Sequence, residues 1–111
     1  MCNAMTLAHS NEGYIIKCRE CKRMQLALGT AVLIITEAQL AHIRERLYHE
    51  VLYKESMASR PDIKQVAIEV NEYAMLCLSL NEMLALQDLI DQAFAVAEAY
   101  QILDKPMEWE N

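Results

Sequence analysis

Apolar positions along this chain change their spacing twice in the same order, from every second residue to every third or fourth. Residues 24–28 alternate apolar and polar side chains and residues 32–35 form a short apolar run, and residues 66–70 and 75–78 repeat this order. Both patterns are typical of strands. The spacing that follows each of them predicts one buried helical face, made of Leu40, Ile43, Leu47 and Val51 in the first case and of Met83, Leu86, Ile90 and Phe94 in the second. The pattern therefore predicts two strand-strand-helix units.

Both predicted helices begin with the same signal. Residues 36–39 read Thr-Glu-Ala-Gln and residues 79–82 read Ser-Leu-Asn-Glu, the capping box in which a hydroxyl and a Glu or Gln side chain satisfy helix-end amides. Pro61 disfavours helix in the residue before it, so the first helix is expected to end within residues 56–62. The two units share apolar positions but few identical residues. This similarity fits an internal duplication, and it fits equally well two unrelated capped helices that each follow strands.

A further strand is predicted at residues 13–18, ending at a turn that contains Cys18 and Cys21. The fold class is therefore α+β, with a mostly antiparallel sheet packed against two long helices. A length of 111 residues is that of one domain. We divide it into an N-terminal arm (residues 1–12), a first unit (13–58), a second unit (59–104) and a C-terminal tail (105–111).

The charge and the composition exclude several classes of function. A formal net charge of -6 argues against DNA or RNA as a partner, because phosphate binding requires clustered Lys and Arg. The one local basic cluster surrounds the cysteine turn and consists of Lys17, Arg19, Lys22 and Arg23. No apolar run approaches the roughly 20 residues of a membrane span, and the first residues do not resemble a signal peptide. We expect a cytoplasmic protein without a membrane partner.

Cys18 and Cys21 have the spacing of half a zinc site. Closed tetrahedral coordination needs four ligands, and Cys2 and His9 are the candidates for the other two, unless a second subunit supplies the same pair of cysteines. Thiol exchange is the alternative, although a redox Cys-x-x-Cys ordinarily lies at a helix N-terminus. Two small residues in a turn that happen to be cysteines are a third interpretation. Zinc is thus the one cofactor that the sequence suggests, in a structural role.

Signatures of an enzyme are absent from the sequence. It has no glycine-rich phosphate loop, no nucleophile elbow and no His-Glu-x-x-His. His42 and His49 are seven residues apart, too far along a helix to share a metal ion, and are expected on the surface. Asp91 and its neighbouring carboxylates are expected along a solvated strip of the second helix. We interpret the chain as a small binding or interaction module, with a thiol-dependent redox or metal-handling protein as the alternative.

The second helix carries two apolar seams within residues 83–103, a surface that needs cover on two sides. A single small sheet covers one side. The other is predicted to be covered either by a second copy of the chain, which gives a homodimer, or by the first helix of the same chain.

A motif around the cysteine turn links this chain to a known group of sequences. It runs Gly13-Tyr14-Ile15-Ile16-x-Cys18-x-x-Cys21-x-x-x-Gln25-Leu26-x-x-Gly29-Thr30, followed later by a Leu78-Ser79-x-x-Glu82-x-x-x-Leu86 helix start. It resembles a family of small uncharacterised proteins from Bacteroidota bacteria, described as a domain of unknown function, and the resemblance covers most of the chain. It implies a bacterial cytosolic protein and no particular activity.

Overall fold

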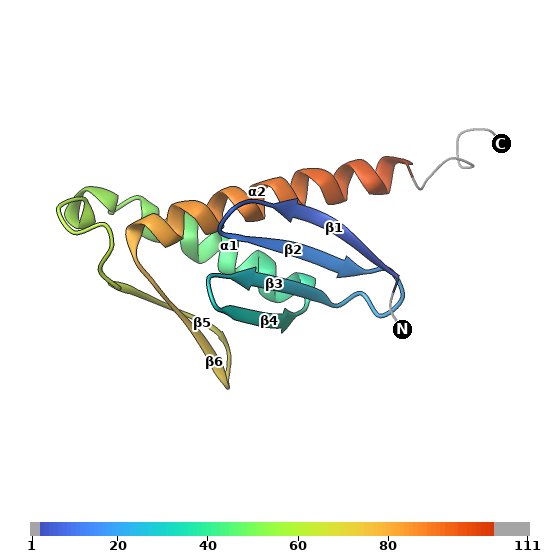
Figure 1. Ribbon diagram of the computed structural model, residues 1–111, viewed down its shortest axis with the longest axis horizontal. Coiled ribbons are helices and arrows are strands. Elements are labelled where there is room, and N and C mark those ends of the chain that lie inside the picture. The colour runs from blue at the N-terminus through green and yellow to red at the C-terminus, as the bar shows by residue number, and fades with distance from the viewer. Residues whose placement is uncertain (1–2, 104–111) are drawn as a thin grey trace.

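Six strands and two long helices make up the computed structural model, which describes residues 3–103 (Figure 1). In chain order these are β1 (Ala4–His9), β2 (Gly13–Cys18), β3 (Met24–Leu28), β4 (Ala31–Ile35), α1 (Glu37–Val51), β5 (Val66–Asn71), β6 (Ala74–Leu78) and α2 (Leu80–Leu103), with a short 3-10 helix, η1, at Lys54–Met57. The predicted α+β class and the two strand-strand-helix units are confirmed. The predicted tail at residues 105–111 lies outside the described residues.

The first four strands form an antiparallel meander in the order β1-β2-β3-β4. Its inner face packs on the helices, and Ile15 lies opposite Leu26 at the centre of that face, both at most 1% exposed. Strand β1 lies within the segment predicted as an arm. Residues 4–9 lack a clear alternation, and they form a strand because β2 offers a hydrogen-bonding edge and α2 offers an apolar surface beneath it.

The second hairpin, β5-β6, is a separate two-stranded sheet and does not continue the first one (Figure 1). It packs mainly on α1. Its inner residues are buried, namely Ile68, Val70, Leu76 and Leu78, while Met75 is 61% exposed and Tyr73 90% exposed. The structure thus divides the predicted sheet into a large part and a small part.

Both capping boxes are present. The hydroxyl of Thr36 accepts from the backbone N–H of Gln39 at 3.1 Å, and the Gln39 side chain accepts from the backbone N–H of Thr36 at 3.0 Å. Ser79 and Glu82 make the same exchange at 3.2 Å and 2.9 Å. Helix α1 ends at Val51, earlier than predicted, because a 3-10 turn takes over before Pro61 is reached.

Glycine has a steric role at two positions in the large sheet. Gly29 has φ 59° in the two-residue loop between β3 and β4, where it is the first central residue, as in a type II′ hairpin turn. Gly13 lies so close to the neighbouring strand that a Cβ there would be 1.9 Å from the carbonyl oxygen of Ala27. These two positions hold β2, β3 and β4 in their observed register.

Helix α2 is covered on two sides within the chain. The sheet covers one side and α1 the other, and Met83, Leu86 and Ile90 are completely buried while Leu89 is 1% exposed. This is the arrangement that the sequence left open as the intramolecular alternative. Further along, Val96, Ala97 and Tyr100 are half-buried.

Candidate functional site

The turn between β2 and β3 holds both motif cysteines. Cys18 ends β2 and is 7% exposed, whereas Cys21 lies exposed in the turn. The backbone N–H of Cys21 lies 3.4 Å from the sulfur of Cys18 and donates to it. Lys22 follows in a left-handed conformation with φ 65°, and its backbone N–H donates to the carbonyl of Cys18. The predicted strand-to-turn position of the motif is therefore confirmed.

The structure does not bring His9 to this turn. Strand β1 runs antiparallel to β2, with Ala4 opposite Cys18 and His9 opposite Tyr14. His9 is therefore about 16 Å of strand from the cysteines. Cys2 lies outside the described residues. Among residues 3–103 no group of three Cys, His, Asp or Glu side chains is placed to hold a metal ion. The zinc site stays a prediction, and the structure places His9 at the end of β1 that lies away from the cysteine turn.

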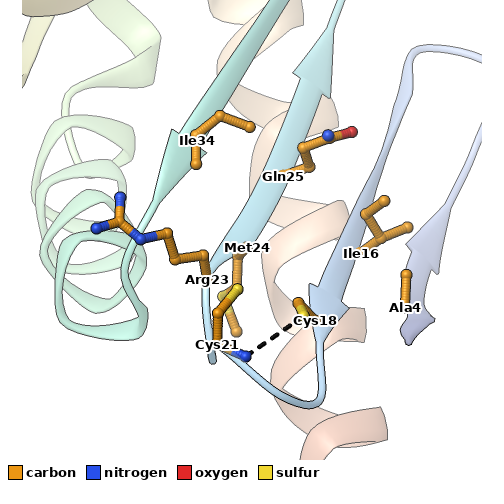
Figure 2. A pocket seen from close by; sticks show the side chains of 8 residues that line it. All are labelled: Ala4, Ile16, Cys18, Cys21, Arg23, Met24, Gln25 and Ile34. Atoms are coloured by element: carbon orange, nitrogen blue, oxygen red, sulfur yellow. Dashed lines mark hydrogen bonds between the residues drawn. The ribbon is translucent and has the colours of Figure 1, made fainter. Parts of the chain in front are cut away.

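A shallow hollow of about 220 Å³ opens beside the cysteine turn on the outer face of the sheet (Figure 2). Its floor is the row of Ile16, Gln25 and Ile34 on three adjacent strands, and Figure 2 shows these side chains standing on the face away from the helices. At the turn end it is lined by Cys18, Cys21, Arg23 and Met24. The hollow is mostly apolar, and no described helix covers it.

A second cavity lies on the other side of the same turn, where the last turns of α2 pass over the sheet. It has a volume of about 360 Å³ and is lined by Met5, Lys17, Arg19, Lys22, Glu37, Ala97, Tyr100 and Gln101. The Lys17 ammonium lies 3.2 Å from a carboxylate oxygen of Glu37. The Arg19 guanidinium lies 5.7 Å from the centre of the Tyr100 ring. The local basic cluster in the sequence is thus divided, with three of its four cations facing this cavity.

The two helices are joined by a polar network that sequence reasoning missed. Arg44 donates to Asp91 at 3.2 Å, the Tyr48 hydroxyl donates to the same oxygen at 2.7 Å, and the guanidinium lies 4.6 Å from the Phe94 ring centre. The hydrogen bond with Tyr48 raises the pKa of Arg44 despite the opposing desolvation, and Asp91 adds to the effect. Asp91 lies on the partly exposed strip expected for it, with its side chain 42% exposed, but it also contacts the other helix. Its partners are 43 and 47 residues away, and no local signal reveals them.

The histidines of α1 lie on the surface, as predicted. Both His42 and His49 are exposed, and the His49 ring packs edge-on against Tyr53 with 5.8 Å between ring centres. Within residues 3–103, no helix combines the length and the apolarity needed to cross a membrane.

The comparison with protein families decides the relationship that the motif suggested. A model described as Family of unknown function (DUF6686) matches residues 1–105. The chain belongs to this family. No curated protein matches the chain, and neither does any solved structure. Membership in DUF6686 agrees with the expected domain of unknown function and assigns no activity, so the function of this member must be argued from its own surfaces.

Proposed function

We propose that the protein is an interaction module that works as a pair of identical chains joined along β4. The observation that carries the proposal is the edge formed by this strand. Strand β4 is the last strand of the large sheet, and its sequence, Ala-Val-Leu-Ile-Ile, contains no charge and no proline. Val32 is 54% exposed and Ile34 53%. An apolar edge strand of this kind is a template for pairing with another chain.

The opposite edge of the same sheet is protected. Strand β1 has a register irregularity between Thr6 and Ala8, and such a bulge interrupts a regular edge. The backbone N–H of His9, at the end of β1, donates to the Gln92 side chain at 3.3 Å. Strand β4 pairs with β3 without a bulge, and among residues 3–103 no side chain forms a hydrogen bond of this kind with its backbone. Pairing is therefore expected at β4 and not at β1.

The hairpin geometry defines which backbone groups β4 offers. Leu28 and Ala31 flank a two-residue loop, so this pair and the pair of Leu26 with Leu33 exchange hydrogen bonds within the hairpin. The N–H and C=O groups of Val32 and Ile34 consequently point outward. A two-fold axis through Leu33 places Val32 of one chain opposite Ile34 of the other, which gives about four intermolecular main-chain hydrogen bonds.

Charge favours a second copy at this position. A chain with a net charge of -6 repels its own copy over most of its surface. Residues 31–35 bring no like charges together when two copies pair, and the exposed Val32 and Ile34 side chains continue the apolar row of the outer face from one sheet into the next. The pair would present one long outer face, including two copies of the hollow in Figure 2.

Native mass spectrometry and light scattering test this proposal. The expected result is a particle of twice the 12.7 kDa chain mass. The double variant Val32→Lys, Ile34→Lys should be a folded monomer, because lysine on an edge strand blocks pairing. Met75→Lys is the matched control, since Met75 is an equally exposed apolar strand residue, at 61%, on the other hairpin. It should remain a dimer.

Two outcomes contradict the proposal. A wild-type monomer at every concentration excludes the pair. A dimer that persists in the Val32→Lys, Ile34→Lys variant excludes β4 as the interface. The interface predicted from the apolar seams of residues 83–103 would then be the one to test.

The thiol functions predicted from the sequence concern a different place, the cysteine turn. They are supported by the position of both cysteines in one strand turn, where the backbone N–H of Cys21 lies 3.4 Å from the Cys18 sulfur. The same mass spectrum tests the zinc proposal by the added mass of a metal ion in each chain. Metal that chelator removes together with folded structure supports a structural zinc, whereas a metal-free chain whose cysteines change oxidation state reversibly supports the redox alternative.

A further inference from the structure

The cavity under the end of α2 gathers several cations on a protein that is acidic as a whole. Three cations from one strand end and its turn, Lys17, Arg19 and Lys22, line it together with one carboxylate, Glu37. Glu37 is held by Lys17, whose side chain is only 15% exposed. Among the described residues that line the cavity, no carboxylate besides Glu37 is present to balance Arg19 and Lys22. The cavity therefore carries an excess of about two positive charges.

The remaining charges of the turn point elsewhere. Glu20 accepts a hydrogen bond from the backbone N–H of Asn3 at 2.9 Å and does not line the cavity, and Arg23 lines the hollow on the opposite face of the sheet. The left-handed conformation of Lys22 is part of the turn that separates these directions. Lys17, Arg19 and Lys22 thus lie on the side of the sheet that faces α2, whereas Arg23 lies on the other side.

The other walls of the cavity are those of a site for a small organic molecule. Helix α2 contributes the methyl group of Ala97, the ring of Tyr100 and the amide of Gln101, and β1 contributes Met5. Arg19 lies against the face of the Tyr100 ring, an arrangement that limits the motion of the guanidinium. A volume of about 360 Å³ falls within the range of small-molecule pockets.

We propose that this cavity binds a small phosphate monoester. Such a group carries a charge of about -1.5 to -2 at neutral pH, which matches the excess of Arg19 and Lys22. Arginine offers paired N–H donors to phosphate oxygens and lysine adds a mobile point charge. The apolar wall of Met5, Ala97 and Tyr100 accommodates the organic part of the ester. This inference does not depend on the pairing of chains along β4.

The probe for this proposal is phenyl phosphate, titrated into the full chain at low salt and followed by amide chemical shifts. Saturable shifts are expected at residues 17–22 and 97–101. Benzoate, which has a similar ring and a single charge, should bind at least tenfold more weakly. The variants Lys22→Gln and Arg19→Gln should each weaken phenyl phosphate binding at least tenfold, because each removes one charged hydrogen-bond donor to the phosphate.

The matched control is Lys54→Gln, which removes one exposed cation from η1, outside the cavity. It should bind phenyl phosphate as the wild type does. Circular dichroism of each variant verifies the fold, and Lys22→Gln tests the site even if Arg19→Gln disturbs the turn. The proposal is overturned if no saturable shifts occur, if benzoate binds as well as phenyl phosphate, or if Lys54→Gln weakens binding as much as Lys22→Gln.

Discussion

The two strand-strand-helix units follow the same local rules but differ in their surroundings. Each helix begins with a complete capping box and buries one face at the same spacing. The hairpin of the first unit is half of a four-stranded sheet, whereas the hairpin of the second unit has only its own two strands and packs mainly on α1. Local sequence therefore determines the order of strands and helix within each unit, whereas the presence of a neighbouring strand determines how many strands the sheet contains.

The difference has a structural consequence for the second unit. Two-stranded hairpins are marginally stable alone, so β5 and β6 depend on the apolar inner residues that they press against the helices. The first hairpin has β2 on one side as an additional support. Equivalent changes in the two units should therefore have unequal effects.

The largest effects are expected from matched core truncations, one in each unit. Ile35 in β4 is 1% exposed and Ile68 in β5 is completely buried. Ile35→Ala and Ile68→Ala should each lower the free energy of unfolding by about 2–5 kcal/mol. The loss should be larger for Ile35→Ala, because the four-stranded sheet relaxes less into the cavity left by the missing side chain than the two-stranded hairpin does. Urea unfolding measures both. An equal or larger loss for Ile68→Ala would show that the second hairpin is held as rigidly as the first.

Removal of either cap hydroxyl should lower stability by a smaller amount, and the loss should again differ between the two units. Thr36 is exposed and Ser79 is 3% exposed. Thr36→Ala and Ser79→Ala should each destabilise the protein by about 0.5–2 kcal/mol, with Ser79→Ala at the upper end because it leaves a poorly hydrated helix amide without an acceptor. Thermal unfolding measures the difference, and Thr30→Ala in the exposed β3-β4 loop is the control. The reverse order would contradict the effect assigned to burial.

The smallest expected effect is a dependence of the free energy of unfolding on pH, which arises from the cap of α2 and not from the cap of α1. The hydrogen bond from Lys64 lowers the pKa of Glu82 below its ordinary value of 4.5, with further help from the backbone N–H of Ser79. A carboxyl with a depressed pKa stabilises the folded state above its ordinary pKa and loses this contribution as the pH falls through the folded value. The corresponding residue of α1 is the uncharged Gln39.

Stability curves of the wild type and of Glu82→Gln should therefore differ at neutral pH. They should approach each other as the pH falls below 4.5 and converge only below the depressed pKa of Glu82, where the folded-state carboxyl is neutral as well. Gln39→Glu supplies the opposite test, because it should give α1 a similar acid sensitivity. Curves that remain parallel down to the lowest pH would exclude Glu82 as the source of this dependence.

The parts of the fold that were predictable depend on residues near each other in sequence. Capping pairs are three residues apart, and the apolar spacing of a helix repeats within a few turns, so both helix starts and both buried faces were predictable from the chain alone. Strand β1 was missed because its residues show little alternation, and its conformation depends on β2 and on α2. The end of α1 was placed too late because Pro61 sets only an outer limit.

The candidate sites show the same limit. The motif predicts that Cys18 and Cys21 share one turn, and they do. Whether His9 reaches them depends on the direction of a strand that was not predicted. The network around Asp91 and the approach of Tyr100 to the basic cluster both require knowledge of how α2 lies on the rest of the chain. Side-chain chemistry is visible in the sequence, whereas convergence of distant side chains becomes visible only in the fold.

The contact between the first strand and the last helix affects how the chain completes its fold during synthesis. Leu7 in β1 is 1% exposed and β1 packs on α2, with the backbone of His9 bonded to Gln92. A ribosome adds about 5–20 residues each second, so roughly 4–17 s separate the synthesis of the strand from that of its cover. During that interval the inner face of the growing sheet is a surface that chaperones can recognise. The native arrangement closes only when the final helix has been made.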